Sequence, residues 1–281
     1  MASADKPRVW FITGASRGLG RSLADAVLEA GDRVVATARD TDALAELPDR
    51  YPGQAMAIAH DVTHTEQTAN AVDQALAEFG GIDVLVNNAG YGLLGALEEL
   101  SEEDLRPQFE TNLFGALNVT RAMLPHFRER RSGHVVQISS LSGVVPNPGE
   151  GAYAASKFAL EGMSESLAQE VAHLGIRVTI VEPGPVRTEF AGRSLSRADP
   201  MDDYADSVGQ VREFLDQLDG SQPNDPARVA RAIIRATEQD VPPLRLPLGE
   251  QAFAQIRDHL AERCRELDET KSLGLETAFA G

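Results

Sequence analysis

Three residues that can exchange protons lie close together in the stretch SLSGVVPNPGEGAYAASKFAL: Ser140, Tyr153 and Lys157. A free tyrosine phenol titrates near ~10, so alone it is a poor acid or base at neutral pH. Lys157 follows Tyr153 by four residues, which places both side chains on one face of a helix, one turn apart. An ammonium group there favours the phenolate and lowers the pKa of the phenol. The pair is either a proton-transfer device or an ordinary surface pair, and the rest of the chain must decide.

A glycine-rich turn near the start of the chain is a second candidate site. TGASRGLG follows an apolar run at residues 8–13 and precedes a helical pattern at residues 20–31, with glycines at Gly14, Gly18 and Gly20. Glycines permit a tight turn and a close approach of the backbone to a ligand. The free N–H groups at the start of the helix can bind a pyrophosphate. The strand–turn–helix context therefore predicts a dinucleotide site.

The end of the second apolar run, residues 33–38, indicates which dinucleotide is bound. NAD sites usually place an acidic residue there for the ribose 2′-hydroxyl, but this chain has Ala38 followed by Arg39. A guanidinium can pair with a 2′-phosphate, and Arg17 in the glycine turn can add a second positive contact. Asp40 argues mildly against this, but it can cap the next short helix. The alternative is two surface arginines; we expect NADP(H) in preference to NAD(H).

The elements that must position these residues alternate along the chain. Near-continuous apolar strands separated by helical patterns indicate a parallel sheet covered on both faces, the doubly wound α/β architecture with three layers. No linker marks a boundary, so we expect one domain over residues 1–281. The expected strands are 8–13, 33–38, 55–60, 83–90, 134–140, 176–184 and 243–249, and the main helices are 20–31, 65–81, 111–131, 152–174, 226–239 and 250–269.

Composition excludes several other classes of protein. The net charge of −17 repels nucleic-acid phosphates and anionic membrane surfaces. No stretch approaches the ~20 apolar residues of a membrane span, and the start lacks a secretory h-region. The single cysteine, Cys264, fits a reducing compartment. The six histidines form no metal-ligand pattern. These features predict a cytoplasmic protein that binds no metal, nucleic acid or membrane.

Further motifs follow in a fixed order: TGASRGLG, HDVT, NNAG, Asn112, SS before a loop, YAASK and EPGPVRT. Each is weak alone, but their order and spacing together are highly specific. The chain resembles the short-chain dehydrogenase/reductase family, in its single-domain branch, over about residues 8–190.

The resemblance implies a role for each matching residue. Asp61 would lie near the adenine amino group, Asn88 would also tie strands together, and Thr188 with the Val186 backbone would hold the nicotinamide carboxamide. Asn87 could be purely structural. The full set implied for the cofactor is Gly14, Ser16, Arg17, Gly18, Leu19, Arg39, Asp61, Val62, Asn88, Ala89, Gly90, Tyr153, Lys157, Pro183, Gly184, Val186 and Thr188.

The catalytic residues implied by the resemblance are Asn112, Ser140, Tyr153 and Lys157. Tyr153 would be the acid/base, and Lys157 together with the positive nicotinamide ring of the oxidised cofactor would lower its pKa. Ser140 would orient the substrate oxygen, and Asn112 would hold a water that links Lys157 to solvent. Ser140 is chosen over Ser139 because it precedes Tyr153 by the usual family spacing of 13 residues.

The implied activity is an NADP(H)-dependent interconversion of a ketone or aldehyde and an alcohol. The alternatives are a non-catalytic NADP(H) sensor of the same fold, which predicts an incomplete tetrad, and an epimerase or dehydratase, which predicts a different glycine spacing. A small carbonyl or alcohol substrate of hydrophobic character is expected, because residues 141–152 and a lid at about 185–225 carry apolar side chains. Family members commonly pair through the helices at 111–131 and 152–174, so we expect a homodimer or homotetramer. We expect residues of about 250–281 to form a C-terminal helical extension.

Overall fold

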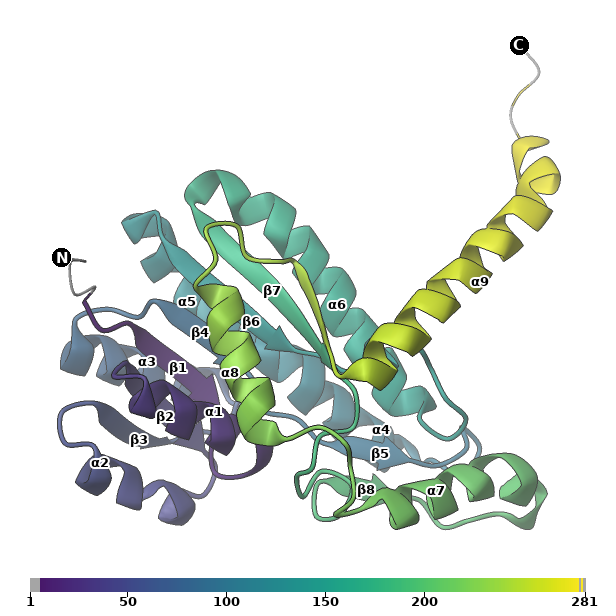
Figure 1. Ribbon diagram of the computed structural model, residues 1–281, viewed down its shortest axis with the longest axis horizontal. Coiled ribbons are helices and arrows are strands. Elements are labelled where there is room, and N and C mark those ends of the chain that lie inside the picture. Colours follow the sequence, from purple (N-terminus) through teal and green to yellow (C-terminus); the bar gives the residue numbers. More distant parts are fainter. Residues whose placement is uncertain (1–5, 278, 280–281) are drawn as a thin grey trace.

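A seven-stranded parallel sheet forms the centre of the protein, with the strand order β3-β2-β1-β4-β6-β7-β9 (Figure 1). The computed structural model describes residues 6–277 and 279. All neighbouring strands of this sheet pair in parallel, which confirms the predicted fold class. The strands are β1 Val9–Thr13, β2 Arg33–Ala38, β3 Ala55–Ala59, β4 Val84–Asn87, β6 Gly133–Ile138, β7 Ile176–Pro183 and β9 Arg245–Leu248.

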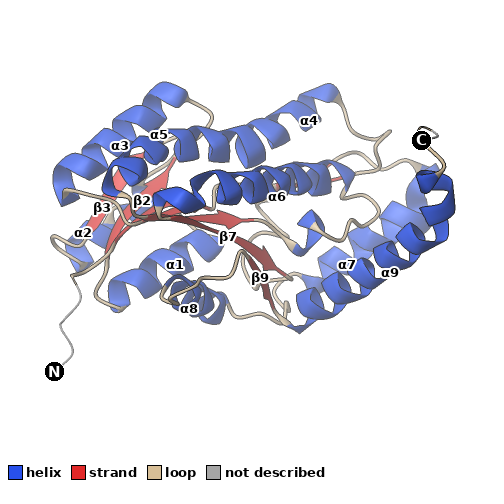
Figure 2. Cartoon of the chain, turned by 90° about the horizontal axis from the view of Figure 1, so that it is seen from above, coloured by secondary structure: helices blue, strands red, loops and turns tan. Residues whose placement is uncertain are grey.

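Helices cover both faces of the sheet (Figure 2). One face carries α1 (Gly18–Glu29) and α8 (Pro226–Thr237), and the other carries α3 (Thr65–Phe79), α5 (Ala116–Arg130) and α6 (Gly151–Val171). Strand β1 shows why both faces need cover, because Trp10 and Ile12 join one core cluster while Phe11 joins the other, all at 0% exposure. Each such side chain contributes about 1.5–3 kcal/mol on burial.

The predicted helix at residues 111–131 is not α-helical throughout. Helix α4 (Glu102–Phe109), which begins with a capping box of Ser101 and Asp104, runs into a π-helical segment, Glu110–Gly115, before α5 begins. This π-helical segment contains Asn112, and such segments are frequent at functional sites. Helical periodicity in the sequence could not reveal it, because it differs from an α-helix by one residue in a single turn.

The segment 185–225 is more ordered than its irregular sequence suggests. Strand β8 (Leu195–Arg197) pairs in parallel with β5 (Gly92–Leu94) to form a separate two-stranded sheet, and α7 (Gln210–Leu218) follows. Neither short strand was predicted, because three residues carry too little alternation to be recognised. The shorter elements elsewhere are α2 at Glu46–Arg50 and 3₁₀ turns at Asp42–Leu44, Leu141–Gly143 and Ala172–Leu174.

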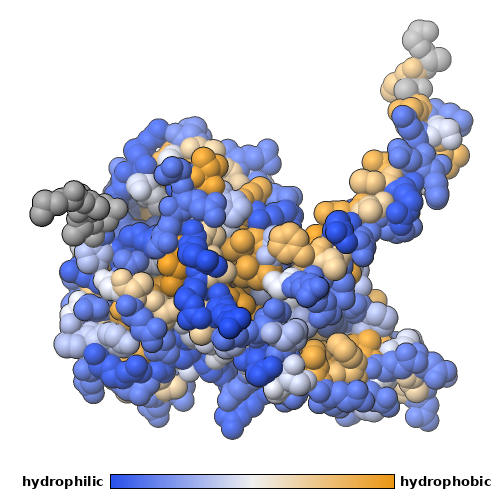
Figure 3. Space-filling view, in the orientation of Figure 1, coloured by the Kyte–Doolittle hydropathy of each residue, from blue (hydrophilic) through white to orange (hydrophobic). Residues whose placement is uncertain are grey.

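The last helix, α9 (Glu250–Leu275), continues beyond the helix expected at 250–269, within the expected extension, and projects from the body of the molecule (Figure 1). Its first turns pack through Ala252 and Ile256 against Leu141 and Val144. Beyond them the helix is exposed, and apolar side chains are visible along it (Figure 3). Across residues 6–277 and 279, no helix combines the length and the apolar character that crossing a bilayer requires.

Candidate active site

A large cavity lies at the carboxyl ends of the central strands. Strand β1 is flanked by β2 on one side and β4 on the other. The order in which successive strands are added to the sheet therefore reverses at β1, and doubly wound folds bind ligands at such a point. The cavity has a volume of about 1580 Å³, and every predicted site residue lines it except Asn112, which lies behind its wall. One continuous site therefore joins the glycine turn to the tyrosine and lysine.

The glycine turn has the geometry that a pyrophosphate requires. Gly14 and Gly18 have φ values of 64° and 58°, in the left-handed region that favours glycine. A Cβ on Gly14 would lie 2.8 Å from the Cα atom of Ala89. Helix α1 begins at Gly18, and the side chain of Arg17 makes no capping hydrogen bond. The first N–H groups of α1 thus remain available to an anion, and the turn fits a dinucleotide cofactor.

Arg39, Asp61 and Val62 lie together on the wall beyond β2 and β3. The carboxylate of Asp61 accepts hydrogen bonds from the backbone N–H and the hydroxyl of Thr63, at 3.0 and 2.8 Å. Burial raises the pKa of Asp61, but these hydrogen bonds, together with the nearby His64 and Arg39, outweigh it and hold that pKa below its ordinary value. The Asp61 side chain is therefore an ionised acceptor, as a contact with an amino group requires.

Asn88 ties two strand ends together, as the resemblance implies. Its Nδ2 donates to the carbonyl oxygens of Thr13 and Gly14 at 2.9 and 3.0 Å. Asn87 has a separate, buried role, because its Nδ2 donates to Thr120 and Gln137 within the core. The structure thus gives Asn87 a place in the core and Asn88 a place on the cavity wall.

The residues after β7 form the opposite wall of the cavity. Pro183, Gly184, Val186 and Thr188 all line it. The Thr188 side chain lies across the glycine turn, 3.6 Å from the position that a Cβ on Gly18 would take. Residues far apart in sequence therefore close around one space, between the start of α1 and the end of β7.

Tyr153 and Lys157 both lie on the first part of α6 and both face the cavity. They are 7% and 5% exposed, so neither belongs to a surface pair. The Nζ of Lys157 donates to the carbonyl oxygen of Ile138 at 2.8 Å and lies 5.8 Å from the centroid of the Tyr153 ring. Ile138 ends β6, two residues before Ser140. The structure thus joins α6 to the strand that carries the serine.

Burial is the main influence on the protonation of Tyr153 and Lys157 in the folded chain. Burial raises its pKa above the ordinary value, and a hydrogen bond with the Ser140 side chain opposes that rise only in part. Burial also lowers the pKa of Lys157 to about 8. Desolvation of the charged forms therefore dominates here, and the phenol is held protonated rather than drawn toward the phenolate.

Asn112 is fixed by contacts within the protein. Its Nδ2 donates to the Tyr91 carbonyl at 3.0 Å and to Ser156 Oγ at 3.1 Å, and its Oδ1 accepts from the Tyr91 N–H at 3.1 Å. The π-helical segment is thereby fastened to the loop after β4 and to α6. The water link between Asn112 and Lys157 stays a prediction.

Ser139 and Ser140 have different partners. The hydroxyl of Ser139 donates to Glu161 Oε1 at 2.5 Å and is buried. Ser140 Oγ accepts from the Ser142 N–H at 3.1 Å and can still donate to a substrate oxygen. This difference favours Ser140 as the residue that contacts substrate.

Some cavity residues escaped the sequence reasoning. Leu215 and Leu218 of α7 and Gln251 and Gln255 of α9 all line the cavity. The signal that could have found the second pair is their spacing of four residues on one helix face. Over the described part of the chain, no group of three or more histidine, cysteine, aspartate or glutamate residues is placed to hold a metal ion.

Comparisons with known proteins agree with this geometry. The family model described as short chain dehydrogenase matches residues 8–199. An oxidoreductase named BOA17 from Botryotinia fuckeliana is 40% identical over 267 residues, covering 92% of this chain and 97% of the relative. A 3-ketodihydrosphingosine reductase from Bacteroides thetaiotaomicron is 37% identical, covering 92% and 94%. Human retinol dehydrogenase 8 is 39% identical, covering 87% and 82%.

Solved structures point the same way. A short-chain dehydrogenase from Streptomyces avermitilis is 46% identical with a TM-score of 0.92, covering 98% of this chain and all of the other. Two more distant structures contain cofactors. A short-chain dehydrogenase/reductase from Burkholderia phymatum in complex with NAD is 26% identical with a TM-score of 0.78, covering 90% of this chain and 92% of the other. A short-chain dehydrogenase from Burkholderia cenocepacia in complex with NADP is 27% identical with a TM-score of 0.74, covering 94% and 97%. The chain therefore belongs to the short-chain dehydrogenase family, whose members are oxidoreductases that act on small molecules with a nicotinamide cofactor.

Proposed function

We propose that the protein is an NADP(H)-dependent oxidoreductase that interconverts a ketone or aldehyde and an alcohol, with Tyr153 as acid/base. The observation that carries the proposal is the convergence of Ser140, Tyr153 and Lys157 at one place in a cavity that also contains the glycine turn. Ser140 follows the end of β6 by two residues, whereas Tyr153 and Lys157 lie on α6 and are buried rather than solvated.

The chain's own residues supply the proton and the orientation. A bound nicotinamide cofactor exchanges a hydride with the substrate carbon. Because Tyr153 is held protonated by burial, its phenol can donate a proton to the carbonyl oxygen as negative charge develops there. Ser140 holds that oxygen through its hydroxyl. The Lys157 ammonium, whose pKa of about 8 leaves it mostly charged at pH 7, stabilises the phenolate that remains.

NADP(H) rather than NAD(H) is the proposed cofactor. Arg17 and Arg39 both line the cavity, and their guanidinium groups suit a 2′-phosphate. The end of β2 offers Ala38, which has no acceptor for a 2′-hydroxyl. The Asp40 carboxylate accepts the Asp42 N–H at 2.9 Å, so it is used by the turn that follows.

The proposed substrate has a bulky apolar group beside its carbonyl or alcohol. Phe190 packs against Tyr153 with ring centroids 5.7 Å apart. Phe214 and Leu218 add further apolar surface from α7. Relatives named retinol dehydrogenase 8 and 3-ketodihydrosphingosine reductase support this class.

The remaining organisation is part of the same proposal. We propose a single domain over residues 1–281 in which the segment 185–225 acts as the substrate lid and 250–281 is an extension. A cytoplasmic homodimer or homotetramer is proposed on the family resemblance and on the single exposed cysteine, Cys264.

The test is NADPH consumption with a panel of apolar ketones and aldehydes, comparing wild type with Tyr153→Phe. We expect kcat to fall by about 10²–10⁴-fold in the variant, because it lacks the general acid. NADPH affinity, measured by fluorescence titration, should change little because phenylalanine keeps the ring in place. NADPH binding by the wild type without turnover of any carbonyl, alcohol or sugar would instead favour a sensor.

A further inference from the structure

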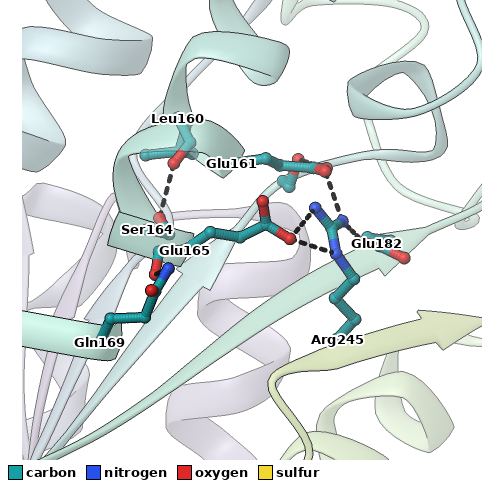
Figure 4. A network of polar contacts seen from close by, with 8 residues as sticks. Leu160, Glu161, Ser164, Glu165, Gln169, Glu182 and Arg245 are labelled. Carbon is teal, nitrogen blue, oxygen red and sulfur yellow. Dashed lines mark hydrogen bonds and ion pairs between the residues drawn. The ribbon is translucent and has the colours of Figure 1, made fainter. Parts of the chain in front are cut away.

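Charged side chains of α6, β7 and β9 form a cluster around Arg245, and two of its carboxylates are buried (Figure 4). Arg245 of β9 extends its guanidinium between three carboxylates, from Glu161 and Glu165 on α6 and Glu182 on β7. Its Nη1 lies 2.6 Å from Glu161 Oε2, and its Nη2 lies 2.8 Å from Glu165 Oε1. The side chains of Glu161 and Glu182 are 4% and 1% exposed, whereas that of Glu165 is 45% exposed.

Glu161 is the member of this cluster that reaches the active site. One carboxylate oxygen accepts from Arg245, and the other accepts from the hydroxyl of Ser139 at 2.5 Å. Ser139 is the immediate neighbour of Ser140, and Glu161 lies one helical turn after Lys157. A single carboxylate therefore connects the end of β6 to α6 and, through Arg245, to β7 and β9.

The space around this carboxylate is tightly restricted. A Cβ on Gly143 would lie 2.2 Å from Glu161 Oε1 and 2.5 Å from Ser139 Oγ. The turn after Ser140 thus passes against the same two atoms. Burial raises the pKa of Glu161 to about 7, and the hydrogen bonds from Ser139 and Arg245 oppose that rise.

We propose that Glu161 is a positioning residue that, with Arg245, holds the β6 end and hence Ser140 in register with Tyr153 and Lys157 on α6. The proposal rests on the function proposed above, since it assigns Ser140 and Tyr153 to one substrate oxygen. Catalysis is sensitive to such positioning, because a displacement of about 1 Å can cost ~10²-fold in rate. Glu161 acts only through Ser139 and the helix, and it does not line the cavity.

The first experiment compares Glu161→Gln with Glu165→Gln. Each change removes one carboxylate that pairs with the Arg245 guanidinium, and both glutamates lie on α6. Only Glu161 also contacts Ser139. We expect kcat to fall about tenfold or more in Glu161→Gln and to change less than about twofold in Glu165→Gln. The KM for NADPH should stay within about threefold in both. Equal losses in the two variants, or none in either, would overturn the proposal.

A double-variant cycle tests the route through Ser139. If Glu161 acts through the Ser139 hydroxyl, Ser139→Ala should lose kcat to a similar degree, and the double variant should lose no more than the larger single loss. Losses that multiply would show that the two residues act separately and would contradict the proposal. Ser139→Ala also serves as a milder change, since it leaves the ion pairs with Arg245 in place.

The pH dependence of kcat distinguishes positioning by the Glu161 carboxylate from a purely structural role, because a structural role predicts no effect of Glu161 protonation on kcat. Protonation of Glu161 replaces its ion pair with a neutral contact, so kcat of the wild type should fall as the pH drops through about 7. That inflection should be absent in Glu161→Gln, and its persistence there would contradict the proposal. The groups that face the carboxylate are Ser139 of β6, Glu182 of β7, Arg245 of β9, and Lys157 and Glu165 of α6.

A structural measurement separates this inference from the proposed function. Crystal structures of the wild type and Glu161→Gln would report the separation between Ser140 Oγ and Tyr153 Oη. An increased separation supports positioning by Glu161 even if the wild type reduces no carbonyl compound, in which case the proposed function alone fails. An unchanged separation overturns the inference even if kcat falls.

Discussion

Replacing Arg39 with alanine should weaken the use of NADPH while leaving the use of NADH nearly unchanged. Arg39 is exposed, directly follows the last residue of β2 and lines the cavity. Its charge acts within this region, because it helps to hold the pKa of Asp61 below its ordinary value. A 2′-phosphate bound there would accept charge-assisted hydrogen bonds from the guanidinium, and a 2′-hydroxyl would lose nothing comparable.

The expected magnitude follows from the exposure of the side chain. A hydrogen bond to a charged group contributes about 1.5–3 kcal/mol. Because Arg39 is exposed, solvent and salt screen its charge and reduce this contribution to about 1–2 kcal/mol. The loss corresponds to roughly a 5–30-fold decrease in kcat/KM for NADPH.

The assay is kcat/KM for NADPH and NADH with one carbonyl substrate at low and high salt. The control is Arg33→Ala at the opposite end of β2, where the guanidinium lies 5.7 Å from the Phe79 ring centroid rather than in the cavity. The control should leave the ratio of the two cofactors unchanged. The wild-type preference for NADPH should decrease as salt rises, because the pairing is exposed.

Two results would refute the reasoning. If Arg39→Ala lowers kcat/KM equally for both cofactors, Arg39 supports the shape of the site and does not recognise a phosphate. If the wild type uses NADH better than NADPH, the end of β2 does not select the phosphorylated cofactor, and the assignment to NADP(H) fails.

Two further predictions concern stability. His134 is buried with its Nε2 2.9 Å from Thr179 Oγ1, and burial lowers its pKa to about 4. The pKa of histidine in the unfolded chain is ~6.5. The contribution of His134 to stability is therefore present above pH ~6.5 and is lost progressively as the pH falls to about 4. In urea unfolding, the free energy of unfolding of the wild type should therefore fall by up to about 3 kcal/mol more than that of His134→Gln over that pH range. Parallel pH profiles of the two proteins would contradict this. A Cβ on Gly20 would lie 2.3 Å from Asn88 Nδ2 and 2.5 Å from the Gly14 carbonyl oxygen, so Gly20→Ala should cost about 1–3 kcal/mol and weaken NADPH binding. Gly162→Ala, where the new Cβ meets nothing within 4 Å, should be neutral or stabilising by about 0.5–1 kcal/mol in thermal melts; a similar loss in both variants would count against the steric argument.

Features set by neighbouring residues were predictable from the sequence. The strand–glycine–helix unit at Gly14 and Gly18 depends on local backbone freedom. The placement of Tyr153 and Lys157 on one face of α6 depends only on helical periodicity. The parallel sheet followed from apolar strands that must be covered on both faces. In each case the determining interaction lies within the element or between consecutive elements.

Features that depend on distant residues were decided by the tertiary structure. The π-helical segment that carries Asn112 and the short pairing of β5 with β8 have no local pattern that distinguishes them. The Ser139 hydroxyl is engaged by Glu161, which the sequence places 22 residues away from Ser139. The link to Arg245 spans a further 84 residues.

The protonation of Tyr153 and Lys157 shows most clearly how sequence and tertiary structure differ in what they determine. The sequence places an ammonium group one turn from a phenol, and this group together with the positive ring of an oxidised nicotinamide cofactor predicts a lowered tyrosine pKa. The folded chain buries both groups, and because desolvation penalises each charged form, the pKa of Tyr153 rises and that of Lys157 falls to about 8. The sequence by itself thus determined which groups are proposed to exchange the proton. Only the tertiary structure decided that desolvation shifts their pKa values, because burial belongs to the assembled core and not to any one segment.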